Sequence, residues 1–370
     1  PFLSCPQSCL APAAHHPLHL QRIPPSASST TSTTQEIKEG STLSSRIALT
    51  YDGGVMMVDG RTMKLINILD KEGFLRLSPT GDNRHLAVAD GSSYQLLDAG
   101  TWEQPHGDHA HIYTTEPTLS PLNLNADHTG HVINHADKTA FFADGTGEFQ
   151  VLNPAQLTGE NQLTVKNVDT QTVKLPSPHH GFAIPLHGNQ FLVSVGTEDA
   201  RTGAAVIDAK GKVLQENKNC PGVHGEAIAA DETITIGCEN GALIYQNGKF
   251  TKIDNPEDPY SRSGNMAGST KSDVVLADYK TDQDAELERP EQFSLINTSN
   301  KTRTKVQLPD GISYTFRSLA RGPEGEALLL TTDGKLRYFD EKQAKNWAIL
   351  ASWMLGKNQK HGRIHAQHCG

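Results

Sequence analysis

The chain has 370 residues, of which 20% are charged and 6% are aromatic, a composition typical of globular proteins that bury a substantial core. It carries 33 basic against 42 acidic residues, a net charge of −9, with no clustered cationic face, which argues against a nucleic-acid partner. No stretch approaches the roughly 20 apolar residues that a membrane-spanning helix needs.

Residues 1–43 are poor in large apolar side chains and dense in Ser, Thr, Pro and His. This composition predicts a disordered leader. Within it, His15, His16 and His19 form a small metal-binding patch with no rigid frame around it. The string at residues 10–14 fits either the tail of a signal peptide or an ordinary part of the leader.

From residue 44 the composition changes. Short segments rich in strand-forming residues recur, and most of them end in Asp-Gly, Asn-Gly or another Gly-containing turn. Seven such units fall between residues 44 and 343, with β-rich strings in the ranges 46–59, 84–91, 140–145, 191–196, 233–241, 274–278 and 327–334. The repeat length of about 43 residues is typical of a β-propeller with four strands per blade. The sequence therefore predicts an all-β fold, a seven-bladed propeller over residues 44–343. Eight blades, or a β-sandwich or two smaller β domains, are the alternatives.

Two segments break this spacing. Residues 101–130 form a connection of about 30 residues between the second and third repeats, and long connections of this kind are usually functional or disordered. Its ligand-type side chains, His106, Asp108, His109 and His111, favour a functional loop. Residues 344–370 do not show the sequence pattern of a blade, and we expect them to form a C-terminal extension outside the propeller.

Three histidines, His131, His180 and His224, open successive repeats. Blades stacked around an axis bring repeat-equivalent positions together, and neutral imidazole is the commonest side-chain metal ligand. We therefore predict a metal site at one end of the channel. A fourth ligand could come from the loop through His106, Asp108 or His109.

More candidate ligands are present than one ion requires. His135 lies four residues after His131 and would point to the same side of a strand. Either two sites exist, or some of these histidines orient the ligands of a single site. Three further histidines, His85, His128 and His187, we expect to be ordinary core or surface residues.

Cys220 and Cys238 lie 18 residues apart and flank one predicted strand pair, where they could meet. A disulfide and two free buried thiols both fit this spacing. No Cys-x-x-Cys pair is present, so a zinc ribbon or a thioredoxin-type site is not expected.

The hypothesis that the protein is an enzyme has less support from the sequence. The chain contains no Gly-x-Ser-x-Gly elbow, no His-Glu-x-x-His motif and no phosphate-binding Gly-rich loop. Glu226, two residues after His224, could act as a base in a metal-dependent, lactonase-like propeller hydrolase, or could accept a hydrogen bond from a ligand. A metal-free scaffold for protein interactions is the third possibility.

Several strings resemble the AztD-type zinc metallochaperones. They are His106–His109 followed by Glu116-Pro117, and the ranges 131–135, 142–147, 179–185 and 220–227. The last string, Cys-Pro-Gly-Val-His-Gly-Glu-Ala, is the most specific. The resemblance covers roughly residues 45–343; the leader and the residues after 343 depart from it.

The resemblance implies a non-enzymatic β-propeller of the bacterial periplasm. Such a protein binds Zn²⁺ and hands it to the solute-binding protein of a zinc ABC importer, without entering the membrane or binding nucleic acid. It also implies that Cys220 and Cys238 form a disulfide. The ligand candidates that it carries over are His106, Asp108, His109, His131, His135, His180 and His224.

Overall fold

A computed structural model describes residues 36–42, 44–158, 165, 167–285, 288–339, 349–354 and 366–369. All of them belong to one compact unit, residues 35–370. The histidines at positions 15, 16 and 19 lie outside the described residues.

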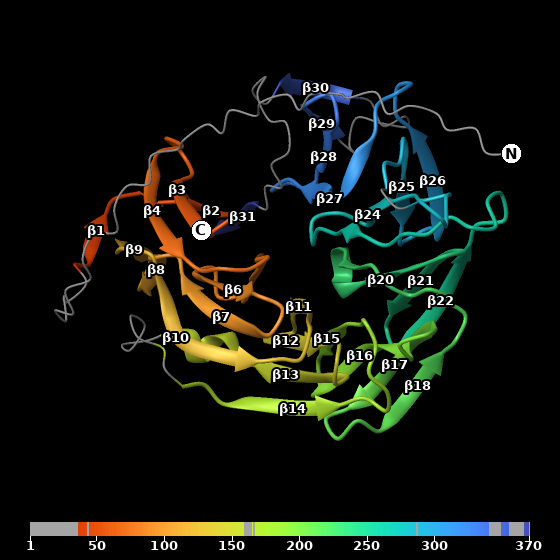
Figure 1. Ribbon diagram of the computed structural model, residues 1–370, viewed down its shortest axis with the longest axis horizontal. Coiled ribbons are helices and arrows are strands. Elements are labelled where there is room, and N and C mark those ends of the chain that lie inside the picture. The colour runs from red at the N-terminus through yellow and green to blue at the C-terminus, as the bar shows by residue number, and fades with distance from the viewer. Residues whose placement is uncertain are drawn as a thin grey trace, which may run out of the picture. The chain divides into compact units, whose positions relative to one another are not determined.

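The described residues form seven four-stranded antiparallel sheets, which confirms the predicted seven-bladed propeller. Figure 1 shows the sheets arranged in a ring, each with one edge strand toward the centre. From the innermost strand outward, blade 1 contains β31 (Ala366–Cys369), β2 (Arg46–Tyr51), β3 (Gly54–Asp59) and β4 (Leu65–Asp70). Blade 2 contains β5 (Arg76–Pro79), β6 (His85–Ala89), β7 (Ser93–Asp98) and β10 (Thr118–Asn125).

The next three blades carry the repeat-opening histidines. Blade 3 contains β11 (Thr129–His135), β12 (Lys138–Ala143), β13 (Glu148–Leu152) and β14 (Thr170–Lys174). Blade 4 contains β15 (Ala183–Leu186), β16 (Gln190–Gly196), β17 (Arg201–Asp208) and β18 (Val213–Asn217). Blade 5 contains β19 (Glu226–Ile228), β20 (Ile234–Cys238), β21 (Gly241–Gln246) and β22 (Lys249–Asp254).

The last two blades complete the ring. Blade 6 contains β23 (Met266–Ala267), β24 (Val274–Asp278), β25 (Gln292–Asn297) and β26 (Thr302–Gln307). Blade 7 contains β27 (Tyr314–Arg321), β28 (Ala327–Thr331), β29 (Lys335–Phe339) and β30 (Ile349–Met354). The described helices are the short 3-10 turns η1 (Pro154–Leu157) and η3 (Ala230–Glu232). Among the described helices, none has the length and apolar character needed to span a membrane.

Apolar clusters between consecutive blades hold the ring together. In several blades the second strand packs on both faces and is buried along its length, as in β6 and β24. Such continuous apolar runs are what fully buried strands show in a sequence. Between blades 3 and 4, the rings of Phe149 and Phe191 meet edge to face with centroids 5.1 Å apart. The outermost strands, such as β4 and β26, are mostly exposed or half-buried.

Strands from both ends of the chain join the sheets. β31 pairs with β2 and so completes blade 1 as its innermost strand, and β30 is the outermost strand of blade 7. Both lie in the stretch that the sequence assigned to an extension, and β1 (Lys38–Gly40) lies in the stretch assigned to the leader. The partner of β31 lies more than 300 residues away in the chain, so a local pattern of turns cannot reveal the pairing.

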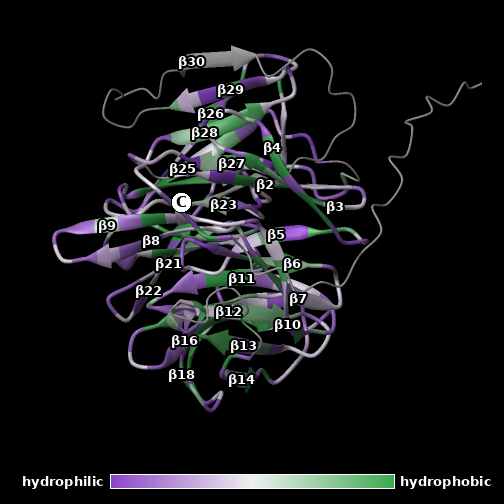
Figure 2. Ribbon diagram, turned by 90° about the vertical axis from the view of Figure 1, so that its left-hand side faces the viewer, coloured by the Kyte–Doolittle hydropathy of each residue, from purple (hydrophilic) through white to green (hydrophobic). Residues whose placement is uncertain are grey.

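The expectation of a long connection without regular structure at residues 101–130 is wrong. β8 (Thr101–His106) and β9 (His109–Thr114) form a hairpin, and β1 adds to its edge to make a separate three-stranded sheet. Gly107, the first residue of the two-residue loop, has φ +63°, a conformation that favours glycine. The hairpin projects away from the blades in Figure 2, and β10 after it closes the outer edge of blade 2.

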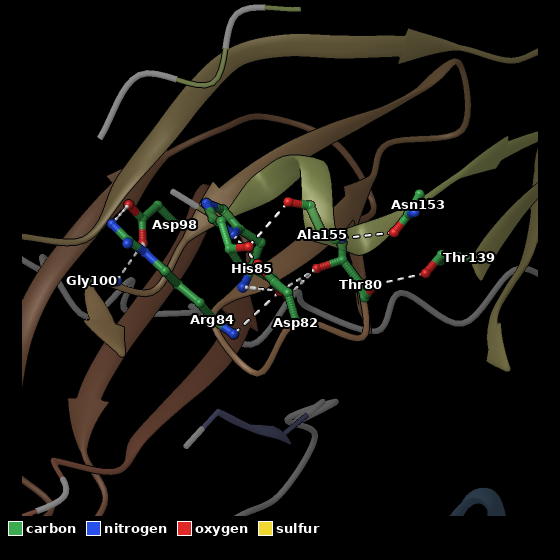
Figure 3. Close-up of polar contacts among 10 residues, drawn as sticks. Thr80, Asp82, Arg84, His85, Asp98, Gly100, Thr139, Asn153 and Ala155 are labelled. Carbon is green, nitrogen blue, oxygen red and sulfur yellow. Dashed lines mark hydrogen bonds and ion pairs between the residues drawn. The ribbon is translucent and has the colours of Figure 1, made fainter. Parts of the chain in front are cut away.

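A buried polar network in blade 2 lies just before the hairpin and reaches Thr139 of blade 3 (Figure 3). Arg84 makes a two-pronged hydrogen bond with Asp98, at 2.8 and 2.7 Å, and its guanidinium lies 3.9 Å from the ring of Trp102 in β8. Next to it, Nδ1 of the buried His85 lies 2.5 Å from the carboxylate of Asp82. His85 is therefore a satisfied core residue, as expected.

Candidate metal centre

The imidazoles of His131, His180 and His224 meet at one end of the innermost strands of blades 3, 4 and 5. One nitrogen of each lies within 4.8 Å of the other two. The ring centroids are 5.4 Å apart for His131 and His180, 5.6 Å for His131 and His224, and 4.8 Å for His180 and His224. The structure thus brings together the three residues that the repeat pattern placed at equivalent positions.

Local sequence explains how two of these histidines reach the centre. His180 and His224 precede β15 and β19, and each is followed by a glycine. A Cβ at Gly181 would lie 2.3 Å from Oγ of Ser194, and one at Gly225 would lie 3.0 Å from the backbone of Gly264. Both positions therefore favour glycine, because a Cβ at either one would require its neighbours to shift.

Each imidazole is held at Nδ1 by an acceptor. Nδ1 of His131 lies 2.8 Å from Oε1 of Glu226, and Nδ1 of His180 lies 2.5 Å from Oδ2 of Asp144. Nδ1 of His224 lies 2.5 Å from the carbonyl oxygen of Gly264. Carboxylate and carbonyl oxygens only accept hydrogen bonds, so Nδ1 carries the proton and Nε2 keeps its lone pair. This is the arrangement in which metal-bound histidines are usually found.

The free nitrogens face one another. Nε2 of His180 lies 2.9 Å from Nε2 of His224. Two lone pairs at this distance repel unless a cation, either a proton or a metal ion, lies between them. The donor set therefore suits a cation that binds nitrogen, and Zn²⁺ is bound by histidine nitrogens in tetrahedral geometry.

Electrostatics keeps one ligand neutral and makes another sensitive to pH. Burial lowers the pKa of His224 well below 6.5, and the neighbouring His131 and His180 act in the same direction. Burial also acts to lower the pKa of His131, but the charge and hydrogen bond of Glu226 outweigh it, so this pKa is raised. His224 is thus a neutral ligand over a wide pH range.

Among the described residues, no fourth protein ligand joins the three histidines. Neither Asp144 nor Glu226 belongs to this group, because each is turned toward the Nδ1 side of a ring. Oε2 of Glu226 is buried and has no hydrogen-bond partner among the described residues, and a cation beside it would compensate this acceptor. A tetrahedral ion held by three imidazoles keeps one coordination position open.

A second group of histidines lies on the hairpin. His106 and His109 are paired across its turn, and one nitrogen each of His106, His109 and His111 lies within 4.8 Å of the others. Nδ1 of His111 lies 2.6 Å from Oε1 of Glu39 in β1, and Nδ1 of His109 lies 3.1 Å from Oδ1 of Asp108. This group is largely exposed and separate from the group of His131, so its members do not complete that site.

His135 belongs to neither group. Its Nδ1 lies 2.7 Å from the carbonyl oxygen of Pro185, and its Nε2 is buried without a partner among the described residues. The other two histidines expected to be ordinary are exposed and ion-paired: His128 with Asp127 and His187 with Glu232.

Sequence reasoning missed Asp144 and Glu39. Asp144 stands in an Asp-Gly turn, where aspartate is common for local reasons. Glu39 lies in the leader, where nothing marks it as a ligand. Their contacts with His180 and His111 cross from one sheet or strand to another, so no local pattern could have revealed them.

Comparison with known proteins relates the chain to zinc chaperones. No protein-family model matches the chain. The zinc chaperone AztD of Citrobacter koseri is 27% identical over 296 residues, which cover 76% of this chain and 65% of AztD. The match thus spans just under two thirds of that relative.

Solved structures show the same fold. The crystal structure of Citrobacter koseri AztD superposes with a TM-score of 0.70 at 24% identity, covering 85% of this chain and 82% of that one. The structure of apo AztD gives a TM-score of 0.69 at 23% identity, covering 86% and 84%. The resemblance predicted from the motifs is confirmed.

Proposed function

We propose that this chain, a relative of the zinc chaperone AztD, is a zinc carrier rather than an enzyme. It binds Zn²⁺ between His131, His180 and His224 and passes the ion to another protein. The observation that carries the proposal is the convergence of three imidazoles, each of which is held at Nδ1 by an acceptor that leaves the lone pair of Nε2 available. The recipient that the family resemblance implies is the solute-binding protein of a zinc ABC importer.

The accessibility of the site supports transfer. The side chain of His180 is 40% exposed and that of His131 is 21% exposed, so an incoming protein can reach the ion. The open fourth position lets a recipient ligand bind before any imidazole leaves. Hydrolysis is less well supported, because Oε1 of Glu226, the candidate base, is engaged with Nδ1 of His131.

The hairpin provides a second proposed zinc site. His106, Asp108 and His109 are predicted ligands, and we add His111, whose Nδ1 lies 2.6 Å from Oε1 of Glu39 and which lies in one group with His106 and His109. The side chain of His109 is 57% exposed and that of Asp108 is fully exposed, so an ion there would exchange readily. We assign this group the capture or release of zinc. His135 stays a predicted ligand that neither group includes.

The disulfide supports a periplasmic location. Cys220 and Cys238 are bonded, as the resemblance implied, and disulfides persist in oxidising compartments such as the periplasm. The bond joins the segment that leads to His224 with the end of β20.

Zinc content and zinc transfer test this function together. The protein is purified without chelator, and its bound zinc is measured for the wild type, for His180→Ala with His224→Ala, and for the control His128→Ala at an exposed position. The double variant should lose the tightly bound ion and all transfer to the zinc-free solute-binding protein, whereas the control should keep both. Unchanged zinc content in the double variant would refute the assignment.

A further inference from the structure

Two arginines beside His224 have buried donors without acceptors. Arg201 begins β17 in blade 4, and Arg262 lies just before β23 in blade 6. Nη1 of Arg201 and Nε of Arg262 are buried and have no hydrogen-bond partner among the described residues. Leaving a buried charged donor without an acceptor is costly, so each of these groups needs a partner, which can be water or a bound anion.

Both arginines are anchored close to the three histidines. The carbonyl oxygen of Arg201 accepts a hydrogen bond from the N–H of Gly222, two residues before His224, at 2.9 Å. On the other side, Arg262 lies two residues before Gly264, whose carbonyl oxygen holds Nδ1 of His224. A Cβ at Gly264 would lie 3.7 Å from Nε and Cζ of Arg262. The segments that carry the two arginines therefore lie on either side of the segment of His224, in blades 4 and 6.

The positive charges of Arg201 and Arg262 affect the histidine site and each other. After burial and the two neighbouring histidines, the charges of Arg262 and Arg201 also act to lower the pKa of His224. Burial, and then the charge of Arg262, lowers the pKa of Arg201. The nearby acceptors only partly offset these charges: the Tyr260 hydroxyl bonds to Arg262, and the carboxylates of Glu239 and Asp144 attract Arg201 from a distance. A dication at the histidines would add to this positive charge, and the repulsion would weaken its binding.

An anion that contacts both the arginines and the ion would remove this repulsion. The planar guanidinium group matches a carboxylate with two parallel hydrogen bonds. Carboxylate oxygen is also a regular zinc ligand, and the three imidazoles leave one position open for it.

We propose that Arg201 and Arg262 form a carboxylate-binding subsite that delivers the fourth ligand to the metal ion held by His131, His180 and His224. The proposal rests on the proposed zinc-binding function. The carboxylate comes either from an acidic side chain of the recipient protein or from a small free carboxylate. In the first case, docking of the recipient itself places a competing ligand on zinc and begins its transfer.

Cobalt substitution tests the subsite, because the visible spectrum of protein-bound Co²⁺ responds to a change of its ligands. Acetate is titrated into the Co²⁺-loaded full chain in perchlorate buffer. In the wild type the spectrum should change saturably. Arg201→Gln and Arg262→Gln should each weaken acetate binding about tenfold or more, by loss of a charged hydrogen bond.

The same variants should bind Co²⁺ more tightly than the wild type when no acetate is present, because one repelling charge is gone. This gain shows that the variant is folded and separates the subsite from a purely structural role. Arg61→Gln, a control at an exposed position, should match the wild type in both measurements. Equal acetate affinity in all four proteins would overturn the proposal.

A blocked Gly-Glu-Gly peptide distinguishes the two sources of the carboxylate. Tighter binding of the peptide than of acetate supports a side chain of the recipient, and equal binding supports a small free carboxylate. A wild type that binds Co²⁺ but does not respond to either compound refutes the subsite alone. A wild type that binds no Co²⁺ at the histidines refutes the zinc-binding function as well.

Discussion

Asp144 of blade 3 holds His180 of blade 4 across the gap between two sheets. Its Oδ2 lies 2.5 Å from Nδ1 of the imidazole, and its Oδ1 lies 3.4 Å from the backbone N–H of Gly181. One carboxylate thus orients both the ring and the chain that carries it. Because the two residues belong to different blades, the metal site depends on how the blades are placed relative to one another.

Replacing Asp144 with Asn should weaken zinc binding about 10- to 100-fold, the usual cost of losing an acceptor that orients a metal-bound histidine. The neutral amide no longer supports the charge on the imidazole–zinc unit. Competition with a chromophoric chelator measures the affinity. Asp127→Asn, at an exposed position where the carboxylate pairs with His128 and not with a proposed ligand, should leave the affinity unchanged. Equal affinities for both variants would show that Asp144 does not orient a ligand.

Zinc affinity should fall on acidification, beginning above pH 6.5. Zinc binds neutral imidazole, so protons compete with it. The pKa of His131 is raised above 6.5, so this ligand is protonated first as the pH falls, whereas His224, with its lowered pKa, stays neutral. Glu226→Gln removes the charge that raises the pKa of His131, so the loss of affinity should then begin at a lower pH. The affinity measured from about pH 5 to about pH 8 checks both statements. A profile that Glu226→Gln does not move would contradict this account.

Changing the hairpin histidines should leave the tight site intact. His106→Ala with His109→Ala should remove one weakly bound metal equivalent and slow zinc transfer, because the two groups do not share ligands. Equilibrium dialysis at rising zinc concentration counts the equivalents, and stopped-flow transfer gives the rate. Loss of the tightly bound ion in this variant would mean that the two groups form one site.

Breaking the disulfide should destabilise the protein and the site. Cys220 and Cys238 close a loop with a sequence separation of 18, for which loop entropy gives about 3 kcal/mol of stability. Cys220→Ser with Cys238→Ser should lower Tm and weaken zinc binding, since Cys220 lies four residues before His224. Calorimetry with and without zinc measures both effects. An unchanged Tm would show that packing around these residues alone holds the loop.

Much of the fold could be predicted because it depends on patterns of neighbouring residues in the sequence. Strands such as residues 140–145 and 327–334 combine β-branched or aromatic runs with Asp-Gly turns, and both are blade strands in the structure. The residues with no turn signal, 349–354 and 366–369, are strands whose identity depends on partners in other parts of the chain. The hairpin at residues 101–114 lacked apolar alternation because most of its side chains face solvent.

By itself the sequence determined the number of blades and the three histidines at equivalent repeat positions, because strand periodicity, turn chemistry and repeat length act over a few neighbouring residues. Only the tertiary structure decided which atoms meet: Asp144 with His180, Gly264 with His224, Glu39 with His111, and β31 with β2. These contacts join residues that lie 36 to more than 300 positions apart. Their geometry follows from how the sheets pack around the axis, which no local pattern of side chains specifies.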